Sequence, residues 1–525
     1  MQKDTCRILQ KTGNFFSFPA VFVNFFEHSE IVGAKVMKRE ERFWDWKDLV
    51  LESGLFFGIS EFIWYVRRKV HGGARGYRIC SIRCFAVLRT CFGLYLLINS
   101  IGMLVFKFGG ASVKSPDAVK NLVEIIKSFN ENLIVVVSAM GKMTNALEQV
   151  VDRYFHQKQG LEDAVRFVED FHKGIMEGLF PVKSSEVFKK ADQLFSILRS
   201  RVSDPPSLNF DYDYDQIVSF GEVISTVIVA EFIKESGLKA RWMDIRRSLK
   251  SDNAYREAKI DWELSEQLVK KDFVFGSDQI LVTQGFLAST INNLTTTLGR
   301  EGSDYTAAIL AYLLDAERVV IWKDVPGVLN ADPKWFDETI LLKQLSYRDA
   351  IELAYYGAGV IHPKTIQPLK QKNIKLQVKS FLHPSEEGTV VGNEVYDKLI
   401  PSFIFKMDQV LISISPKDFS FIAEENLELI LGFFARHGFR ISLMQNSAVS
   451  FMVCVNNDMT RIPRVIKDLE DHFLVKWENG LELITIRYYD EQTISRVLVN
   501  KDKVLEQRSK ETIQMVVRDL GTGKN

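Results

Sequence analysis

The stretch 103–112, MLVFKFGGAS, constrains the fold more than any other part of the chain. A short apolar strand leads into Lys107 and then into a glycine pair, Gly109 and Gly110, and apolar residues at helical spacing follow over 118–129. Glycines let backbone N–H groups approach an anion, and a lysine beside them supplies positive charge. The stretch therefore predicts a phosphate-binding turn between a strand and a helix.

From Met103 onward, strand patterns alternate with helix patterns. Apolar runs predict strands over 133–141, 278–286 and 317–327, and helical spacing predicts helices over 216–233 and 306–316. Apolar runs without alternation are typical of a mostly parallel sheet covered by helices on both faces. Ligands in such α/β folds bind beyond the carboxyl ends of the strands, where the polar motifs of this chain are expected to gather.

Composition narrows the class of protein. The chain has 525 residues, which is too long for a single core, and its 67 basic and 67 acidic residues balance. No global basic field would therefore recruit nucleic acid, and we expect no nucleic-acid partner. Its five cysteines form no paired CxxC motif and no disulfide framework, which favours a reducing, cytoplasmic location.

Residues 1–102 look unlike the rest of the chain. They hold four of the five cysteines and show no sustained periodicity. The uncharged stretch 91–106 is shorter than the roughly 20 residues that span a bilayer, so we expect no membrane partner. We interpret 1–102 as an atypical N-terminal extension from a misassigned start, with the biological chain beginning at Met103. An intact mass that includes residues 1–102 would contradict this.

Three further segments carry chemistry. In TTTLGREGSDYTAA (295–308), Arg300 lies between two glycines and can bind a carboxylate through two parallel hydrogen bonds, while Ser303 and Asp304 begin a helix, as site residues or as simple caps. Glu222, on an apolar helix face, is either a partner for a substrate ammonium or half of a structural salt bridge. The segment KDVPGVLNADPK (323–334) suits the ribose and phosphates of a nucleotide, although alone it would be only a turn.

Taken together, seven motifs occur in one order and spacing: KFGGAS at 107–112, SAMGKMTN at 138–145, SFGE at 219–222, TQGF at 283–286, TTTLGREGSDYTAA at 295–308, WKDVPG at 322–327 and YGAGVIHPKT at 356–365. This set closely resembles the aspartate kinases of the amino acid kinase family, and the resemblance covers Met103 to the C-terminus. It implies that ATP with Mg²⁺ phosphorylates the side-chain carboxylate of L-aspartate to give 4-phospho-L-aspartate, the entry to lysine, threonine and methionine synthesis.

The resemblance also implies roles for individual residues. The implied catalytic residues are Lys107 and Asp304. The implied aspartate-binding residues are Thr144, Glu222, Arg300 and Ser303. The implied nucleotide-binding residues are Lys107, Gly109, Gly110, Ser138, Lys323, Asp324 and Lys334. No dedicated metal site is expected, because Mg²⁺ would ride on the ATP phosphates.

The chain departs from the family pattern at two positions. Ala111 replaces the usual hydroxyl residue after the glycine pair, and Gly359 stands where many members have a nucleotide-binding lysine. Lys364 lies in the same loop and is a candidate replacement for that lysine. Since Lys107, Glu222, Arg300 and Asp304 are all present, we expect an active enzyme.

Beyond residue 408 the pattern reads β-α-β-β and then repeats in part, which predicts two ferredoxin-like α+β modules. They resemble the family's paired ACT domains, which bind an amino-acid effector at a dimer interface, here through Ser442, Gln445, Asn446 and Ser447. Lysine-inhibited members offer acidic groups to the effector, and the matching positions here are Ser442 and Ala448. Effector identity therefore stays open, and we expect no fused homoserine dehydrogenase.

The predicted domains are the extension 1–102, an amino acid kinase catalytic domain over 103–390 and paired ACT domains over 391–525, assembled as a homodimer or homotetramer. Two alternatives stay open. One is a related small-molecule carboxylate kinase, for example one acting on glutamate. The other is a non-catalytic amino-acid-binding regulator, for which a phosphate cradle would have no use.

Overall fold

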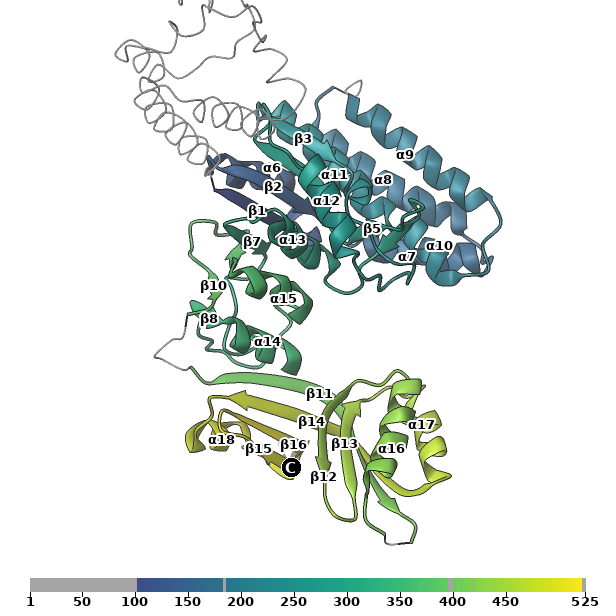
Figure 1. Ribbon diagram of the computed structural model, residues 1–525, viewed down its shortest axis with the longest axis vertical. Coiled ribbons are helices and arrows are strands. Elements are labelled where there is room, and N and C mark those ends of the chain that lie inside the picture. Colours follow the sequence, from purple (N-terminus) through teal and green to yellow (C-terminus); the bar gives the residue numbers. More distant parts are fainter. Residues whose placement is uncertain (1–101, 183–185, 395–399, 419, 522–525) are drawn as a thin grey trace, which may run out of the picture. The chain divides into compact units, whose positions relative to one another are not determined.

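The computed structural model describes residues 102–182, 186–394, 400–418 and 420–521 (Figure 1). The predicted N-terminal extension, apart from Gly102, lies outside these residues. The prediction that the biological chain begins at Met103 lies there with it and stays a prediction.

An eight-stranded sheet forms the centre of the first half, in the order β3-β4-β2-β1-β7-β9-β10-β8. Its strands are β1 (Met103–Phe108), β2 (Asn132–Val137), β3 (Ala240–Met243), β4 (Ile280–Gln284), β7 (Arg318–Lys323), β8 (Gln344–Ser346), β9 (Lys375–Ser380) and β10 (Thr389–Gly392). All neighbouring pairs are parallel except β9 with β10. The predicted mostly parallel sheet is therefore confirmed. A small hairpin, β5 (Leu287–Ser289) and β6 (Thr295–Thr297), lies outside it.

Helices cover both faces of this sheet. They are α6 (Pro116–Lys127), α7 (Met143–Phe155), α8 (Leu161–Leu179), α9 (Glu186–Ser203), α10 (Phe210–Val218), α11 (Phe220–Glu235), α12 (Trp262–Asp272), α13 (Gly302–Leu313), α14 (Tyr347–Tyr356) and α15 (Pro363–Lys372), with short 3₁₀ turns at Gly110–Val113 and Ile245–Arg247. Along β1, Val105 joins the core that contains α13, whereas Leu104 and Phe106 join the core that contains α6. Both faces are buried, which explains why β1 is apolar at every position before Lys107.

The helix predicted over 216–233 is divided into α10 and α11 at Ser219, whose φ of −56° and ψ of −24° are themselves helical, so the two segments follow one another almost without a break. Among the described residues, this stretch, Phe210–Glu235, is long and apolar enough to cross a membrane, yet 78% of its apolar window is buried inside the protein. Its hydropathy is thus that of a core helix.

The second half forms a six-stranded sheet in the order β12-β13-β11-β14-β16-β15, with every neighbouring pair antiparallel. Its elements are β11 (Ser402–Pro416), α16 (Glu424–Arg436), β12 (Ile441–Asn446), β13 (Phe451–Asn456), α17 (Ile462–Glu470), β14 (Phe473–Arg487), α18 (Glu491–Val497), β15 (Lys501–Arg508) and β16 (Thr512–Asp519). The part from residue 409 through α17 into β14 follows the predicted β-α-β-β-α-β order.

The second module differs from the simple repeat that the sequence suggests. Strand β14 runs through Gly480 without a break and pairs with β11 along both halves. The partner of its second half is Ser402–Lys406, a segment that precedes the first module. Register shifts between Lys406 and Leu411 let one long strand serve both modules, so the modules share a sheet.

The turn after β4 brings α13 against the end of the sheet. A β-carbon on Gly285 would lie 2.4 Å from Cβ and 2.7 Å from Cα of Ser303, in the first turn of α13. Only a glycine permits this approach, since the nearest atoms include backbone. Gly285 thereby sets the position of Ser303.

We predict that Gly285→Ala lowers the free energy of unfolding by about 1–3 kcal/mol, because the added methyl forces α13 away from β4. Urea unfolding measures the change. Gly276→Ala is the matched control, since a β-carbon there meets nothing within 4 Å. Equal stability of the two variants would contradict the proposed contact.

Candidate functional site

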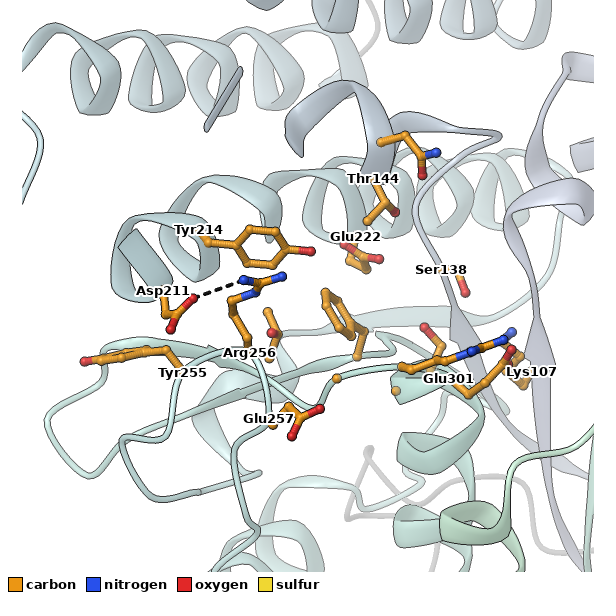
Figure 2. A pocket seen from close by; sticks show the side chains of 17 residues that line it. Lys107, Ser138, Thr144, Asp211, Tyr214, Glu222, Tyr255, Arg256, Glu257 and Glu301 are labelled. Carbon is orange, nitrogen blue, oxygen red and sulfur yellow. Dashed lines mark hydrogen bonds and ion pairs between the residues drawn. The ribbon is translucent and has the colours of Figure 1, made fainter. Parts of the chain in front are cut away.

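A pocket of about 880 Å³ opens at the carboxyl ends of β1 and β2 (Figure 2). It brings together six residues singled out from the sequence: Lys107, Ser138, Thr144, Glu222, Arg300 and Ser303. Its other lining residues are Asn145, Asp211, Tyr214, Tyr255, Arg256, Glu257, Phe286, Thr297, Gly299, Glu301 and Gly302. Residues from five separate motifs thus surround one cavity.

Asp304, which does not line the pocket itself, forms ion pairs with two lysines. It lies in the first turn of α13, is fully buried, and contacts Lys107 Nζ at 2.6 Å and Lys323 Nζ at 3.3 Å. Burial alone would raise the pKa of Asp304, but Lys107 and then Lys323 outweigh it, and the pKa lies below its usual value. The carboxylate therefore stays ionised and fixes two ammonium groups at the ends of neighbouring strands.

Lys323 is held from a second direction as well. Its Nζ donates to the carbonyl of Val360 at 2.5 Å and lies 3.9 Å from Glu301 Oε2. It does not line the pocket, and neither do the other predicted nucleotide residues Asp324 and Lys334. Those two side chains are exposed to solvent. The structure thus separates the 323–334 segment from the cavity itself.

The glycine pair also lies beside the pocket rather than in its wall. A β-carbon on Gly110 would lie 2.6 Å from the carbonyl oxygen of Gly141 and 2.8 Å from that of Ala139. Gly110 therefore allows the turns that follow β1 and β2 to touch. The chain then forms a short 3₁₀ turn, and α6 begins at Pro116 after it, with the Ser115 side chain capping the helix.

Glu222 is a buried carboxylate with an unsatisfied oxygen. It lies in the first turn of α11, where Oε1 accepts a hydrogen bond from the Ala139 N–H at 3.3 Å and Oε2 has no partner. Burial raises its pKa to about 8. Within the described part of the chain it forms no salt bridge, which removes the structural alternative for this residue. A cationic group of a ligand would satisfy it.

Arg300 is presented to the cavity by a strained turn. Gly299 and Glu301 on either side of it have positive φ angles of 76° and 56°. Across the described residues, no carboxylate pairs with Arg300 and no group hydrogen-bonds to it, and its side chain is exposed. The capping alternative for Ser303 and Asp304 is wrong, because Glu301 occupies the N-cap of α13 and no side chain caps that helix.

Sequence reasoning missed the opposite wall of the pocket, which is formed by Asp211, Tyr214 and Arg256 (Figure 2). These residues are positioned by Asp215, a buried carboxylate that accepts hydrogen bonds from the Arg256 N–H at 3.0 Å and from the Thr297 N–H and hydroxyl at 2.8 and 2.7 Å. Burial raises the pKa of Asp215 to about 6. The alternation of acidic and aromatic residues in FDYDYD (210–215) could have indicated this wall, since a helix must bury some of the residues in such a run.

A model of the amino acid kinase family matches residues 102–380, which is more than half of the chain. The chain belongs to the amino acid kinase family. The matched region contains every strand of the eight-stranded sheet except β10. It also contains every residue that lines the pocket.

Several members of the family are similar to this chain over most of its length. Lysine-sensitive aspartokinase 3 of Escherichia coli is 29% identical over 405 residues, which cover 73% of this chain and 86% of that protein. The crystal structure of E. coli aspartokinase III in complex with aspartate and ADP has a TM-score of 0.68 and 25% identity, and it covers 79% of this chain and 96% of its own. The structural match therefore reaches beyond the family model into the C-terminal sheet.

Some relatives are larger. The chloroplastic bifunctional aspartokinase/homoserine dehydrogenase 2 of Arabidopsis thaliana is 31% identical over 344 residues, covering 62% of this chain. The match spans only 37% of that plant protein. The matched part of this chain therefore corresponds to little more than a third of the plant protein.

We predict that, without ligands, Glu222→Gln stabilises the protein increasingly as the pH rises from 5 to 8. Because the pKa of Glu222 is raised from 4.5 to about 8, the folded protein keeps a proton that the unfolded chain releases, so stability falls with pH in this window. Glutamine cannot titrate, and the gain should reach a few kcal/mol.

Thermal melts across this pH range measure the gap between the variant and the unaltered protein. The matched control is Glu235→Gln, at the exposed end of the same helix. A gap for Glu222→Gln that stays constant with pH would show that this carboxyl group titrates normally.

Proposed function

We propose that the protein transfers the γ-phosphoryl group of ATP to the side-chain carboxylate of L-aspartate and forms 4-phospho-L-aspartate. The observation that carries the proposal is the unsatisfied, buried Glu222 in one pocket with the unpaired Arg300 and with Lys107. A buried carboxyl group and an arginine that both lack an ion-pair partner among the described residues match the ammonium and carboxylate of an amino acid. The positive charge of Lys107, in the same pocket, suits the negative charge of a phosphoryl group during transfer.

In this proposal, Glu222 binds the ammonium of aspartate and Arg300 binds its α-carboxylate, while Thr144 and Ser303 complete the site with hydroxyl groups. The side-chain carboxylate is already a nucleophile, so the enzyme needs no general base. Lys107 stabilises the charge on the transferring phosphoryl group, and Asp304 positions Lys107. Most of the catalysis then comes from orientation and electrostatics.

We further propose that the nucleotide binds beside Gly109, Gly110 and Ser138, with Lys323, Asp324 and Lys334 along its length. The E. coli relative was solved with ADP, which supports a nucleotide substrate. Mg²⁺ would come with the ATP phosphates and keep most of its waters, supplying charge to the reacting group. Within the described residues, no group of three or more His, Cys, Asp or Glu side chains is arranged to hold a metal ion.

We expect a cytoplasmic enzyme that assembles as a homodimer or homotetramer, although the plant relative is named as chloroplastic. The C-terminal sheet would carry the regulatory function.

The experiment that tests the proposal is ATP consumption with hydroxylamine trapping of an acyl phosphate, run with aspartate, with glutamate and without an acceptor. Hydroxamate that forms only with aspartate supports the assignment. A preference for glutamate would favour the related carboxylate kinase. No turnover with either acid, despite measurable amino-acid binding, would favour the non-catalytic regulator.

We predict that Lys107→Ala lowers turnover by about two to three orders of magnitude, since the lost charge stabilisation is typically worth roughly 3–4 kcal/mol in the transition state. Removing one partner of the buried Asp304 should also destabilise the fold. Urea unfolding of the same variant measures the loss of stability separately, and Lys323 at 3.3 Å still pairs with Asp304 in it. Turnover above a tenth of the parent would contradict the role of Lys107.

We predict that lysine alone inhibits this enzyme weakly. Ser442 and Ala448 supply no carboxylate, and the Ser442 hydroxyl accepts a hydrogen bond from Lys406 Nζ at 3.2 Å. A lysine ammonium would lack a charge-assisted bond worth roughly 1.5–3 kcal/mol, or about ten- to a hundredfold in affinity. We expect any regulation to come from a neutral effector such as threonine, bound with Gln445, Asn446 and Ser447.

Titration of activity with lysine, threonine and both together, at subsaturating aspartate, measures this. Strong inhibition by lysine alone, as the name of the E. coli relative describes for that protein, would show that acidic groups reach the effector site from elsewhere in the assembly.

A further inference from the structure

The pocket extends beyond the residues proposed to bind aspartate. At about 880 Å³ it is several times larger than a four-carbon amino acid. Its outer end contains Arg256, Asp211 and Tyr214, which lie across the cavity from Ser138 and Lys107 in Figure 2. The proposed function gives no role to this end of the pocket.

The backbone at Arg256 has an unfavourable conformation for a residue with a side chain. Its φ angle is 68°, in the left-handed region that favours glycine. The backbone is held there by the hydrogen bond from its N–H to the buried Asp215. A large side chain kept in such a conformation at the wall of a pocket points to a function for that side chain.

The guanidinium of Arg256 is fixed in place but only partly used. Its centre lies 4.5 Å from the centroid of the Tyr214 ring, and Nη1 donates to Asp211 Oδ1 at 3.1 Å. Among the described residues, its other N–H donors have no hydrogen-bond partner. The Tyr214 ring and Asp211 therefore set the plane of the guanidinium, and the remaining donors are available to a ligand.

We propose that Arg256 forms an outer subsite that binds the α-carboxylate of the amino-acid acceptor together with Arg300. This inference rests on the proposed function, because it takes the acceptor to be an acidic amino acid. A planar fork of N–H donors matches a carboxylate, and stacking on Tyr214 lowers the entropy lost when the ligand binds. Since Arg256 lies across the cavity from Lys107 in Figure 2, it contributes to binding and not to phosphoryl transfer.

The test uses Arg256→Gly, because glycine adopts the observed φ and keeps the N–H donor to Asp215. We expect a melting temperature at or above that of the unaltered protein. We also expect the KM for aspartate and the calorimetric Kd to rise about tenfold, the usual effect of losing a charge-assisted hydrogen bond. The kcat and the KM for ATP should stay within twofold, since equal loss of ground-state and transition-state binding changes KM alone.

Two further variants sharpen the result. Arg256→Lys keeps the charge without the fork, so its KM should lie between those of the parent and the glycine variant. Arg436→Ala removes an arginine that stacks on Phe433 at the same 4.5 Å but lies outside the pocket, and it should leave every constant unchanged. An aspartate affinity of Arg256→Gly within twofold of the parent overturns the subsite, as does a fall in kcat at unchanged KM. Failure of the proposed function would instead appear as no phosphoryl transfer by the unaltered protein.

Discussion

The site depends on one buried carboxylate, Asp304, and on the two lysines that it holds. A fully buried, ionised aspartate is stable only with positive charge beside it, and Lys107 and Lys323 provide that charge from adjacent parallel strands. The same contacts fix both ammonium groups at the carboxyl edge of the sheet. Gly285 makes the arrangement possible, because it lets the first turn of α13 reach the end of β4. The close packing of Gly285 against Ser303 and the ion pairs of Asp304 therefore both fix the first turn of α13.

Glu222 is the complementary case across the same pocket. It is buried almost as deeply as Asp304, yet it forms no salt bridge within the described chain, and burial raises its pKa more than the charge of Lys107 lowers it. A protein retains such a group at a cost in stability, and a bound ammonium would remove that cost. The two carboxyl groups thus differ in one respect: only Asp304 has ion-pair partners among the described residues.

The sequence predicted the mostly parallel sheet, because apolar runs act locally, and it singled out six of the residues that line the pocket, because they lie on recognisable motifs. It could not predict that β11 and β14 each serve two modules, since strand pairing between residues 402 and 487 is a long-range choice. It also missed Arg256, which lies in an irregular segment and reaches the pocket only through its contact with Asp215. The position of Lys323 behind the pocket, bonded to Val360, likewise depends on tertiary packing.

We infer that Glu222 is protonated in the unliganded protein and releases its proton to the solvent when the ammonium of aspartate binds beside it. Calorimetric titration of aspartate at pH 7, repeated in buffers of different ionisation enthalpy, measures the protons exchanged on binding. With a pKa of about 8 before binding, Glu222 should release close to one proton for each aspartate bound, and Glu222→Gln should release none. Aspartate binding to the unaltered protein without proton release would contradict the account.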